Sequence, residues 1–243
     1  MILFIGDSFT YGQGLQYYYL TEHKGWSWED CEKMVNSQYR FEWLGIDEDE
    51  FRKQNSFPYL VSKEIDLPYH TPRCENGSDN QVSYEMIRDI QPFCSITNIT
   101  FIVVQFTEPS RSILNGNEPK FDTIDEEIEH QVSRIDELLK QYNVEWLGIS
   151  WMPEIGKILK DKYPKNFVPI KYNGEYYECF EPQYHPKLQQ LTIEYSEGIE
   201  DGHFNLEGHK VLSDSILEKY YSRKDLMNKV KNLKQKINDT IFG

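Results

Sequence analysis

The sequence predicts an α/β protein whose parallel sheet is covered by helices on both faces. Apolar runs of strand length occupy residues 1–5, 99–106 and 144–150. Apolar side chains recur every three or four positions at residues 82–90 and 124–139, which is helical spacing. Strands that alternate with helices form parallel sheets, because each helical crossover returns the chain to the same edge of the sheet.

The first strand leads into the principal candidate site. Met1 to Ile5 runs directly into Gly6-Asp7-Ser8, and Gly12 and Gly14 follow. A strand, a tight turn and a helix start together present a serine hydroxyl at the carboxyl edge of an α/β sheet. The alternative interpretation is that Ser8 only caps the helix that follows it.

Residues 16–54 break the regular pattern. Aromatic residues crowd this stretch together with the acidic run 47–50, and its periodicity is poor. We expect an insertion or a flap beside the serine, and not a core element. The aromatic side chains either pack the insertion onto the domain or form an aromatic wall around a substrate cleft.

Regular elements resume after this insertion. Ser56 can cap a helix that runs to about residue 65, with Pro58 in its first turn. A short second strand is expected at residues 67–74. The turn residues 75–80 then lead into the next helix.

The last third of the chain is less regular. Residues 153–200 are rich in Pro, Tyr and Lys, and they predict an irregular excursion. A helix capped by Asn205 follows. Residues 222–243 predict a basic amphipathic helix that either docks on the domain, as we expect, or forms a coiled-coil seam between copies of the chain, which would make a homo-oligomer. Its apolar positions are Leu226, Val230, Leu233, Ile237 and Ile241.

Length and composition fit one α/β domain at residues 1–221 followed by that helix. The 243 residues carry a net charge of −14, which argues against a nucleic-acid partner. No apolar run approaches the length of a membrane span, and a cleaved signal peptide would remove Ser8, so we expect a cytoplasmic location. Four cysteines without a C-x-x-C pair argue against a zinc site.

A serine needs a base and a carboxylate to become a nucleophile, and the sequence offers both near its other end. Asp201 and His203 are two residues apart, so an extended segment projects both side chains to the same side. The carboxylate can then orient the imidazole toward Ser8. His209 and His185 are competing bases, although His209 is expected to brace the loop.

An acyl-transfer site also needs donors for the developing oxyanion. The backbone N–H of Ser8 is one candidate. Gly77 offers a second backbone N–H in the turn before a helix, and Asn80 offers a side-chain amide. Ordinary turn chemistry is the alternative explanation for Gly77 and Asn80.

These motifs, in this order, resemble the GDSL/SGNH hydrolase superfamily. The matching residues are Gly6-Asp7-Ser8-Phe9, the glycine turn after the second strand, and Asp201-Gly202-His203 with Asn205 and Gly208-His209. The resemblance implies a flavodoxin-like three-layer α/β/α sandwich with a parallel sheet of about five strands. It also implies that Ser8 is the nucleophile, Gly77 an oxyanion donor, Asp201 the acid and His203 the base.

The chain departs from that family in two places. The usual third block, G-x-N-D after the third strand, is absent, and residues 104–111 stand there instead. Asn80 is the expected replacement for the lost asparagine, with Thr107 as the alternative donor. The acid and base are spaced D-x-H and not D-x-x-H, which is similar to relatives that act on acylated polysaccharides.

The sequence therefore predicts a serine esterase that cleaves a carboxylic ester, such as an O-acyl group on a carbohydrate, with no metal or organic cofactor. The alternative is a catalytically silent binding module for a carbohydrate or an acyl-bearing ligand. A third hypothesis, a self-assembling structural protein, depends on residues 222–243 alone.

Overall fold

A computed structural model describes residues 1–35, 45–72, 79–89, 98–108 and 121–242. The first half contains these elements: β1 (Ile2–Ile5), α1 (Ser8–Tyr11), α2 (Leu15–Lys24), α3 (Trp28–Val35), α4 (Ile46–Asn55), α5 (Phe57–Ile65), β2 (Tyr69–His70), α6 (Asn80–Arg88) and β3 (Phe101–Phe106). The second half contains α8 (Ile124–Gln141), β4 (Glu145–Ser150), α9 (Pro153–Lys162), β5 (Ile170–Tyr172), β6 (Glu175–Tyr177), η2 (Pro186–Leu191), α10 (Ile193–Glu197) and α11 (Leu206–Phe242).

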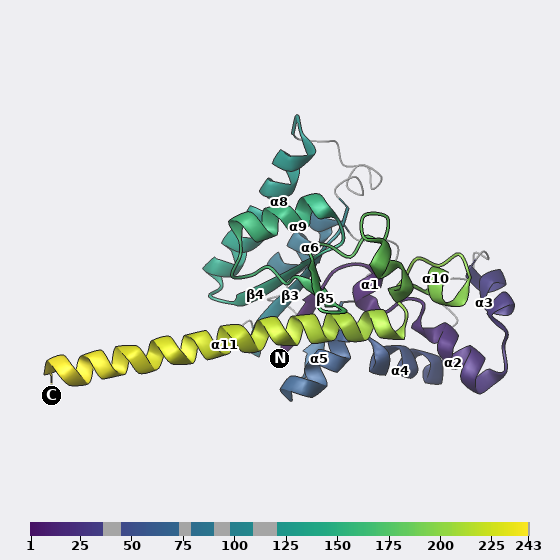
Figure 1. Cartoon of the computed structure of the whole chain (residues 1–243), viewed down its shortest axis with the longest axis horizontal. Helices are drawn as coiled ribbons and strands as arrows, with labels where there is room; N and C mark the ends of the chain where they lie inside the picture. The colour runs from purple at the N-terminus through teal and green to yellow at the C-terminus, as the bar shows by residue number, and fades with distance from the viewer. Residues whose placement is uncertain (36–44, 73–78, 90–97, 109–120, 243) are drawn as a thin grey trace.

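The fold is a three-layer α/β/α sandwich around a parallel sheet with the strand order β2-β1-β3-β4 (Figure 1). Ile5 of β1 pairs with Val104 of β3, and Val104 pairs with Gly148 of β4. The chain passes from β1 to β2 on one side and then to β3 on the other. Residues that follow β1 and β3 therefore meet at a switch point of the sheet, where α/β proteins bind ligands.

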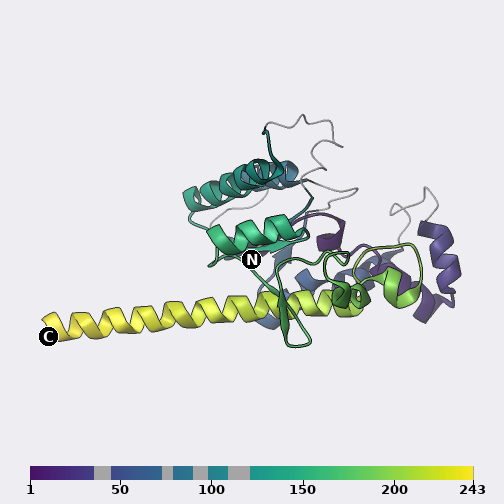
Figure 2. The same ribbon diagram turned by 45° about the horizontal axis from the view of Figure 1, so that its top comes forward.

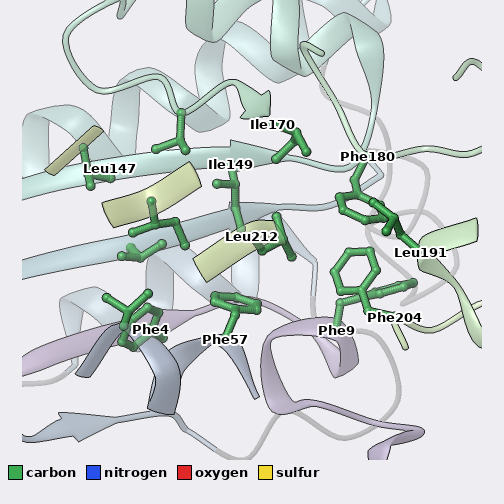
Figure 3. Packing of buried hydrophobic residues seen from close by; sticks show 14 of the residues in the cluster. Phe4, Phe9, Phe57, Leu147, Ile149, Ile170, Phe180, Leu191, Phe204 and Leu212 are labelled. Atoms are coloured by element: carbon green, nitrogen blue, oxygen red, sulfur yellow. The ribbon is translucent and has the colours of Figure 1, made fainter. Parts of the chain in front are cut away.

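Alternate residues of the strands point into two separate cores, one on each face of the sheet. Ile2 and Phe4 of β1 pack with α5 and with the N-terminal part of α11. Leu3 and Ile5 pack with α6, α8 and α9 on the opposite face. Figure 3 shows the first core, in which Phe4 of β1 lies beside Phe57 of α5, and Phe9 lies beside Phe204.

The described part of the sheet has four strands, one fewer than expected. An isolated parallel bridge joins Phe167 to Gly148 at the outer edge of β4, where a fifth strand would lie. The second strand was expected at residues 67–74. Among the described residues 67–72, only Tyr69 and His70 pair with β1, and residues 73–74 lie outside the described part.

Residues 16–54, expected as an insertion or a flap, are mostly helical in their described part despite their poor periodicity. Helices α2, α3 and α4 form there, and Tyr17, Tyr18 and Leu20 are buried with Ile193 in a third apolar cluster. These aromatic residues pack the segment onto the domain. Residues 36–44, which hold further aromatic side chains, lie outside the described residues.

The expectation of an irregular segment at 153–200 was wrong for residues 153–162, which form the helix α9. Ile155, Ile158 and Leu159 are buried against the sheet and make α9 a regular covering helix. These residues are three and one positions apart, which is helical spacing. The many Pro and Tyr residues after residue 163 hid this short pattern when the whole segment was considered. The rest of the segment forms the β5–β6 hairpin, η2 and α10.

The C-terminal helix is one continuous element, because α11 runs from Leu206 to Phe242 without a break between residues 221 and 222. Its C-terminal part extends past the α/β layers in both views and does not fold back onto them (Figures 1 and 2). The expected docking is therefore not observed. The structure describes the backbone of residues 226–242 and not their side chains, so the apolar positions of the predicted seam stay a prediction.

Candidate active site

Ser8 stands at the carboxyl end of β1 because a tight, capped turn places it there. Asp7 caps α1, with its carboxylate accepting a hydrogen bond from Phe9 N at 3.0 Å. Gly12 ends this four-residue helix in a left-handed conformation, with φ of 84°. Ser8 is therefore the first residue of a short helix, where backbone N–H groups have no intrahelical acceptor. The turn presents both its hydroxyl and its N–H at one point.

The segment that carries Asp201 and His203 is held by backbone hydrogen bonds to the start of α10. Ile193 N donates to His203 O at 2.8 Å, and Glu194 N donates to Asp201 O at 2.9 Å. Asn205 anchors the next turn, since its amide donates to Gln190 O at 2.7 Å and its oxygen accepts from Gly208 N. The loop is therefore fixed on both sides of His203.

Three side chains from the two ends of the chain form a continuous hydrogen-bonded row. His203 Nε2 lies 2.9 Å from Ser8 Oγ. His203 Nδ1 contacts Asp201 Oδ1, which also accepts the His203 backbone N–H at 2.9 Å. This is the order of groups in a Ser-His-Asp triad.

The electrostatics suit this arrangement. Burial opposes ionisation of Asp201, but hydrogen bonds from His203 and the Tyr17 side chain outweigh it, so the pKa of Asp201 lies below its ordinary value. An ionised Asp201 accepts a hydrogen bond from His203 Nδ1–H and leaves the lone pair of Nε2 facing Ser8. Tyr17 comes from α2, so the inserted helices contribute to the site.

Close packing supports the imidazole ring on one face and the loop that carries it at Gly14. Phe9 lies against it, with ring centroids 4.7 Å apart, and Phe9 in turn packs on Trp151 at 4.2 Å. Gly14, with φ of 95°, faces the other part of the loop. A Cβ on Gly14 would clash with Ile193 Cδ1 and lie 3.4 Å from His203 Cβ, so only glycine fits there.

Neither competing histidine takes the place of His203 within the described residues. His209 is fully buried on α11, and its Nδ1 accepts a hydrogen bond from Phe57 N at 3.2 Å. Burial lowers the pKa of His209 to about 3, so this side chain is neutral and braces the fold. His185 packs edge-on against Tyr177, and burial lowers its pKa as well.

The structure describes Asn80 and Thr107 among the expected oxyanion donors, but not Gly77. Gly77 lies outside the described residues. Asn80 already donates both amide hydrogens, one to Thr107 O at 3.0 Å and one to Gln131 Oε1 at 2.8 Å, and it accepts Thr107 N. Its amide is thus committed to holding Thr107, which argues against its expected role as an oxyanion donor. Thr107 Oγ1 is buried and finds no hydrogen-bond partner in the described part of the chain.

Other reactive groups in the described residues do not form a competing centre. Burial raises the pKa of Cys31 to about 11 and that of Cys179 to about 12, so both remain thiols; Cys74 and Cys94 lie outside the described residues. No group of three His, Cys, Asp or Glu side chains in these ranges is arranged to hold a metal ion. Within the same ranges, no helix is long and apolar enough to span a membrane.

A cavity of about 500 Å³ lies beside the serine turn and is lined in part by Thr10, Tyr11 and Arg52. Arg52 is 3% exposed, and its Nε and Nη2 donate to Asp49 Oδ1 while Nη1 donates to Tyr11 O. Its charge is therefore engaged within the fold, and the cavity is not an evident anion site.

Comparison with known proteins finds no matching family model and no matching curated protein. Solved structures with similar folds do exist. The chain is 8% identical to TesA, with a TM-score of 0.48 over 90% of this chain and 96% of that one. It is 11% identical to a member of the lipolytic protein G-D-S-L family from Veillonella parvula DSM 2008, with a TM-score of 0.44 over 89% and 96% of the two chains.

A third similar structure is LAE5, an α/β hydrolase from the metagenome of Lake Arreo, Spain. It is 13% identical, with a TM-score of 0.46 over 90% of this chain and 93% of that one. With these three TM-scores below 0.5, we base neither the fold nor the function of this chain on the likeness. The functional inference below uses the geometry of its own residues.

Sequence reasoning missed two residues at this site. Tyr17 was grouped with the aromatic residues of the insertion, and no pattern in the sequence linked it to Asp201. Gln105 lies in the buried strand β3 and hydrogen-bonds Asp7 beside the serine. A lone polar residue in an otherwise apolar strand was a signal that could have identified it.

Proposed function

We propose that this protein is a serine hydrolase that cleaves a carboxylic ester through an acyl-enzyme on Ser8. The observation that carries the proposal is the row of hydrogen bonds from Ser8 Oγ through His203 to Asp201. A hydroxyl, an imidazole and a buried carboxylate in this order make a weak nucleophile reactive.

In the first half of the reaction, Ser8 Oγ attacks the ester carbonyl carbon while His203 Nε2 takes the hydroxyl proton. The tetrahedral intermediate collapses, His203 returns the proton to the leaving alcohol oxygen, and the acyl group stays on Ser8 Oγ. In the second half, His203 deprotonates a water that attacks the acyl carbon, and the carboxylic acid leaves as Ser8 regains its proton. Asp201 orients His203 and stabilises the imidazolium in both halves.

The oxyanion of the intermediate needs donors at the same edge of the sheet. Ser8 N–H is the first, because it opens α1. Thr107 Oγ1 is the second. Ser8 and Thr107 each lie three residues beyond the paired residues Ile5 and Val104, and Asn80 holds the Thr107 backbone at its N–H and its carbonyl. Gly77 stays a proposed third donor.

The geometry of the site fits any carboxylic ester. We base the proposed substrate class, O-acylated carbohydrates, on one feature of the sequence. The D-x-H spacing of Asp201 and His203 is similar to that of relatives acting on acylated polysaccharides, which makes an O-acyl group on a carbohydrate the first ester to test. Acetylated sugars should be compared with simple aryl esters of the same acyl group, because the comparison separates acyl recognition from sugar recognition.

Labelling with a fluorophosphonate tests the proposal directly, because this probe reacts with a serine that a base and oxyanion donors activate. We expect label on the peptide containing Ser8, and its loss in Ser8→Ala and His203→Ala. Ser215→Ala is the matched control, since Ser215 is a buried serine on α11 that bonds Lys171 N and Val211 O. Ligand binding without label or turnover would instead favour the silent binding module.

A further inference from the structure

Gln105 is the only polar residue of β3, whose sequence is Phe-Ile-Val-Val-Gln-Phe. It is 4% exposed, in a strand buried along its whole length. Burying a primary amide costs free energy unless both of its ends are hydrogen-bonded. A role in packing alone would be served better by an apolar side chain, so the two hydrogen bonds of this amide need an explanation.

The two ends of the amide bind the residues on either side of the nucleophile. Gln105 Nε2 donates to Asp7 Oδ1 at 2.8 Å, and the Thr10 hydroxyl donates to Gln105 Oε1. A carboxylate can only accept, which fixes the orientation of the amide. Asp7 and Thr10 are 1% and 2% exposed, so water does not compete for these bonds.

Gly6 makes this arrangement sterically possible. The pairing of Ile5 with Val104 brings Gly6 opposite Gln105. A Cβ on Gly6 would lie 2.8 Å from Gln105 Cβ and would clash with the Thr10 hydroxyl. The missing side chain of Gly6 therefore leaves the space through which Gln105 reaches both Asp7 and Thr10.

We propose that Gln105 is a positioning residue for the nucleophile, and this inference rests on the proposed hydrolase function. Asp7 Oδ1 caps α1 through Phe9 N and also accepts from Gln105, so one amide ties the start of the serine turn to the rigid strand β3. Its other end ties down Thr10, one turn later. Ser8 is held between the two, with its Oγ at 2.9 Å from His203 Nε2.

The test compares three variants by the rate at which fluorophosphonate labels Ser8. Gln105→Met keeps the length of the side chain and removes both hydrogen bonds. We expect a labelling rate about 10- to 100-fold lower, because small displacements of a reacting group have effects of this size. In ester hydrolysis, kcat should fall while KM stays unchanged, since no contact with the substrate is lost.

Gln105→Glu places two carboxylates face to face and should also lower the rate. The new carboxylate can still accept from the Thr10 hydroxyl, so this variant isolates the bond between position 105 and Asp7 Oδ1. In both variants at position 105, a fall in kcat at unchanged KM separates a positioning role from a merely structural one.

Asp136→Ala is the matched control for a lost buried bond. Asp136 on α8 is 7% exposed and accepts from Trp146 Nε1 at 3.0 Å, near the amino end of β4. This variant should lower the melting temperature and leave the labelling rate unchanged.

The outcomes separate the two proposals. A folded Gln105→Met protein labelled at the unmutated rate overturns the positioning role and leaves the hydrolase standing, and so does a folded Gln105→Glu protein labelled at that rate. Failure of the unmutated chain to label at Ser8 overturns both. If Gln105→Met does not fold, Thr10→Val takes its place, because it removes only the bond from Thr10 to Gln105 Oε1. A lower labelling rate in Thr10→Val then supports the positioning role of Gln105, and an unchanged labelling rate overturns it.

Discussion

Ser8 Oγ and His203 Nε2 lie 2.9 Å apart although 195 residues separate them in the chain. The distance depends on two independently fixed segments, the capped turn after β1 and the loop bonded to α10. The two segments also approach each other at Gly14. Because Gly14 has no side chain, the start of α2 can lie against Ile193 and the loop that carries His203. The proposed reaction depends on how well these contacts hold the two groups together.

Replacing Asp201 with asparagine tests the role of its charge. Asp201→Asn keeps the shape but favours the wrong tautomer of His203, so kcat should fall by about 10³- to 10⁴-fold. Ester hydrolysis under saturating substrate measures it. Asp136→Asn, a buried carboxylate change on α8, should leave kcat unchanged. Activity of Asp201→Asn near that of the unmutated protein would contradict the triad.

Replacing Thr107 with valine should lower activity without lowering stability. Its hydroxyl is buried without a partner among the described residues, so Thr107→Val removes an unsatisfied polar group and should leave the protein equally or more stable. As an oxyanion donor, however, its loss should lower kcat by about 10²- to 10³-fold. Thr107→Ser should keep most activity. A Thr107→Val protein with full kcat would exclude the hydroxyl as a donor.

Gly14 should tolerate alanine less well than a glycine in open space. Gly198 also has a positive φ, at 74°, but no atom lies within 4 Å of a Cβ built there, among the described residues. Gly198→Ala should therefore cost only the backbone strain, about 1–2 kcal/mol. Gly14→Ala adds the clash with Ile193 to this strain, so the variant should unfold at a lower denaturant concentration. Because the clash displaces His203, kcat should fall as well. Equal effects in the two variants would refute the close-approach argument.

His209 predicts an acid dependence of stability. Burial, together with the nearby His203 and Arg52, lowers its pKa in the folded protein to about 3. The unfolded chain binds this proton below its ordinary pKa of about 6.5, so the free energy of unfolding should fall by up to about 1.4 kcal/mol per pH unit between these values. The contribution is intact above pH 6.5 and is lost as the pH falls toward 3.

His209→Gln isolates that contribution, because the glutamine oxygen can still accept from Phe57 N but does not titrate. Denaturant unfolding at pH 7, 6 and 5 should show a shallower loss of stability in the variant than in the unmutated protein. Because all other carboxylates and histidines are common to both proteins, the difference in slope reports His209 alone. Parallel slopes would show that His209 is not buried in its neutral form.

The sequence by itself determined the strands β1, β3 and β4, and it predicted the three side chains Ser8, Asp201 and His203 of the proposed triad. Residues 101–106 and 145–150 are apolar runs that have to be buried, and the serine turn and the D-x-H motif carry their own local signals of glycine spacing and same-side projection. The helix at 124–141 was equally evident from its spacing. These signals come from residues that are close in sequence, so they predict local structure without knowledge of the residues that pack against it.

Only the tertiary structure decided which polar groups remain available for chemistry. Asn80 looked like a free amide in a turn, but Gln131 and Thr107, distant in sequence, engage both of its hydrogens. Tyr17 and Gln105 gained their roles from contacts across 184 and 98 residues, with Asp201 and Asp7 respectively. Hydrogen-bond saturation of a buried group depends on its neighbours in space, and no pattern along the chain specifies those neighbours.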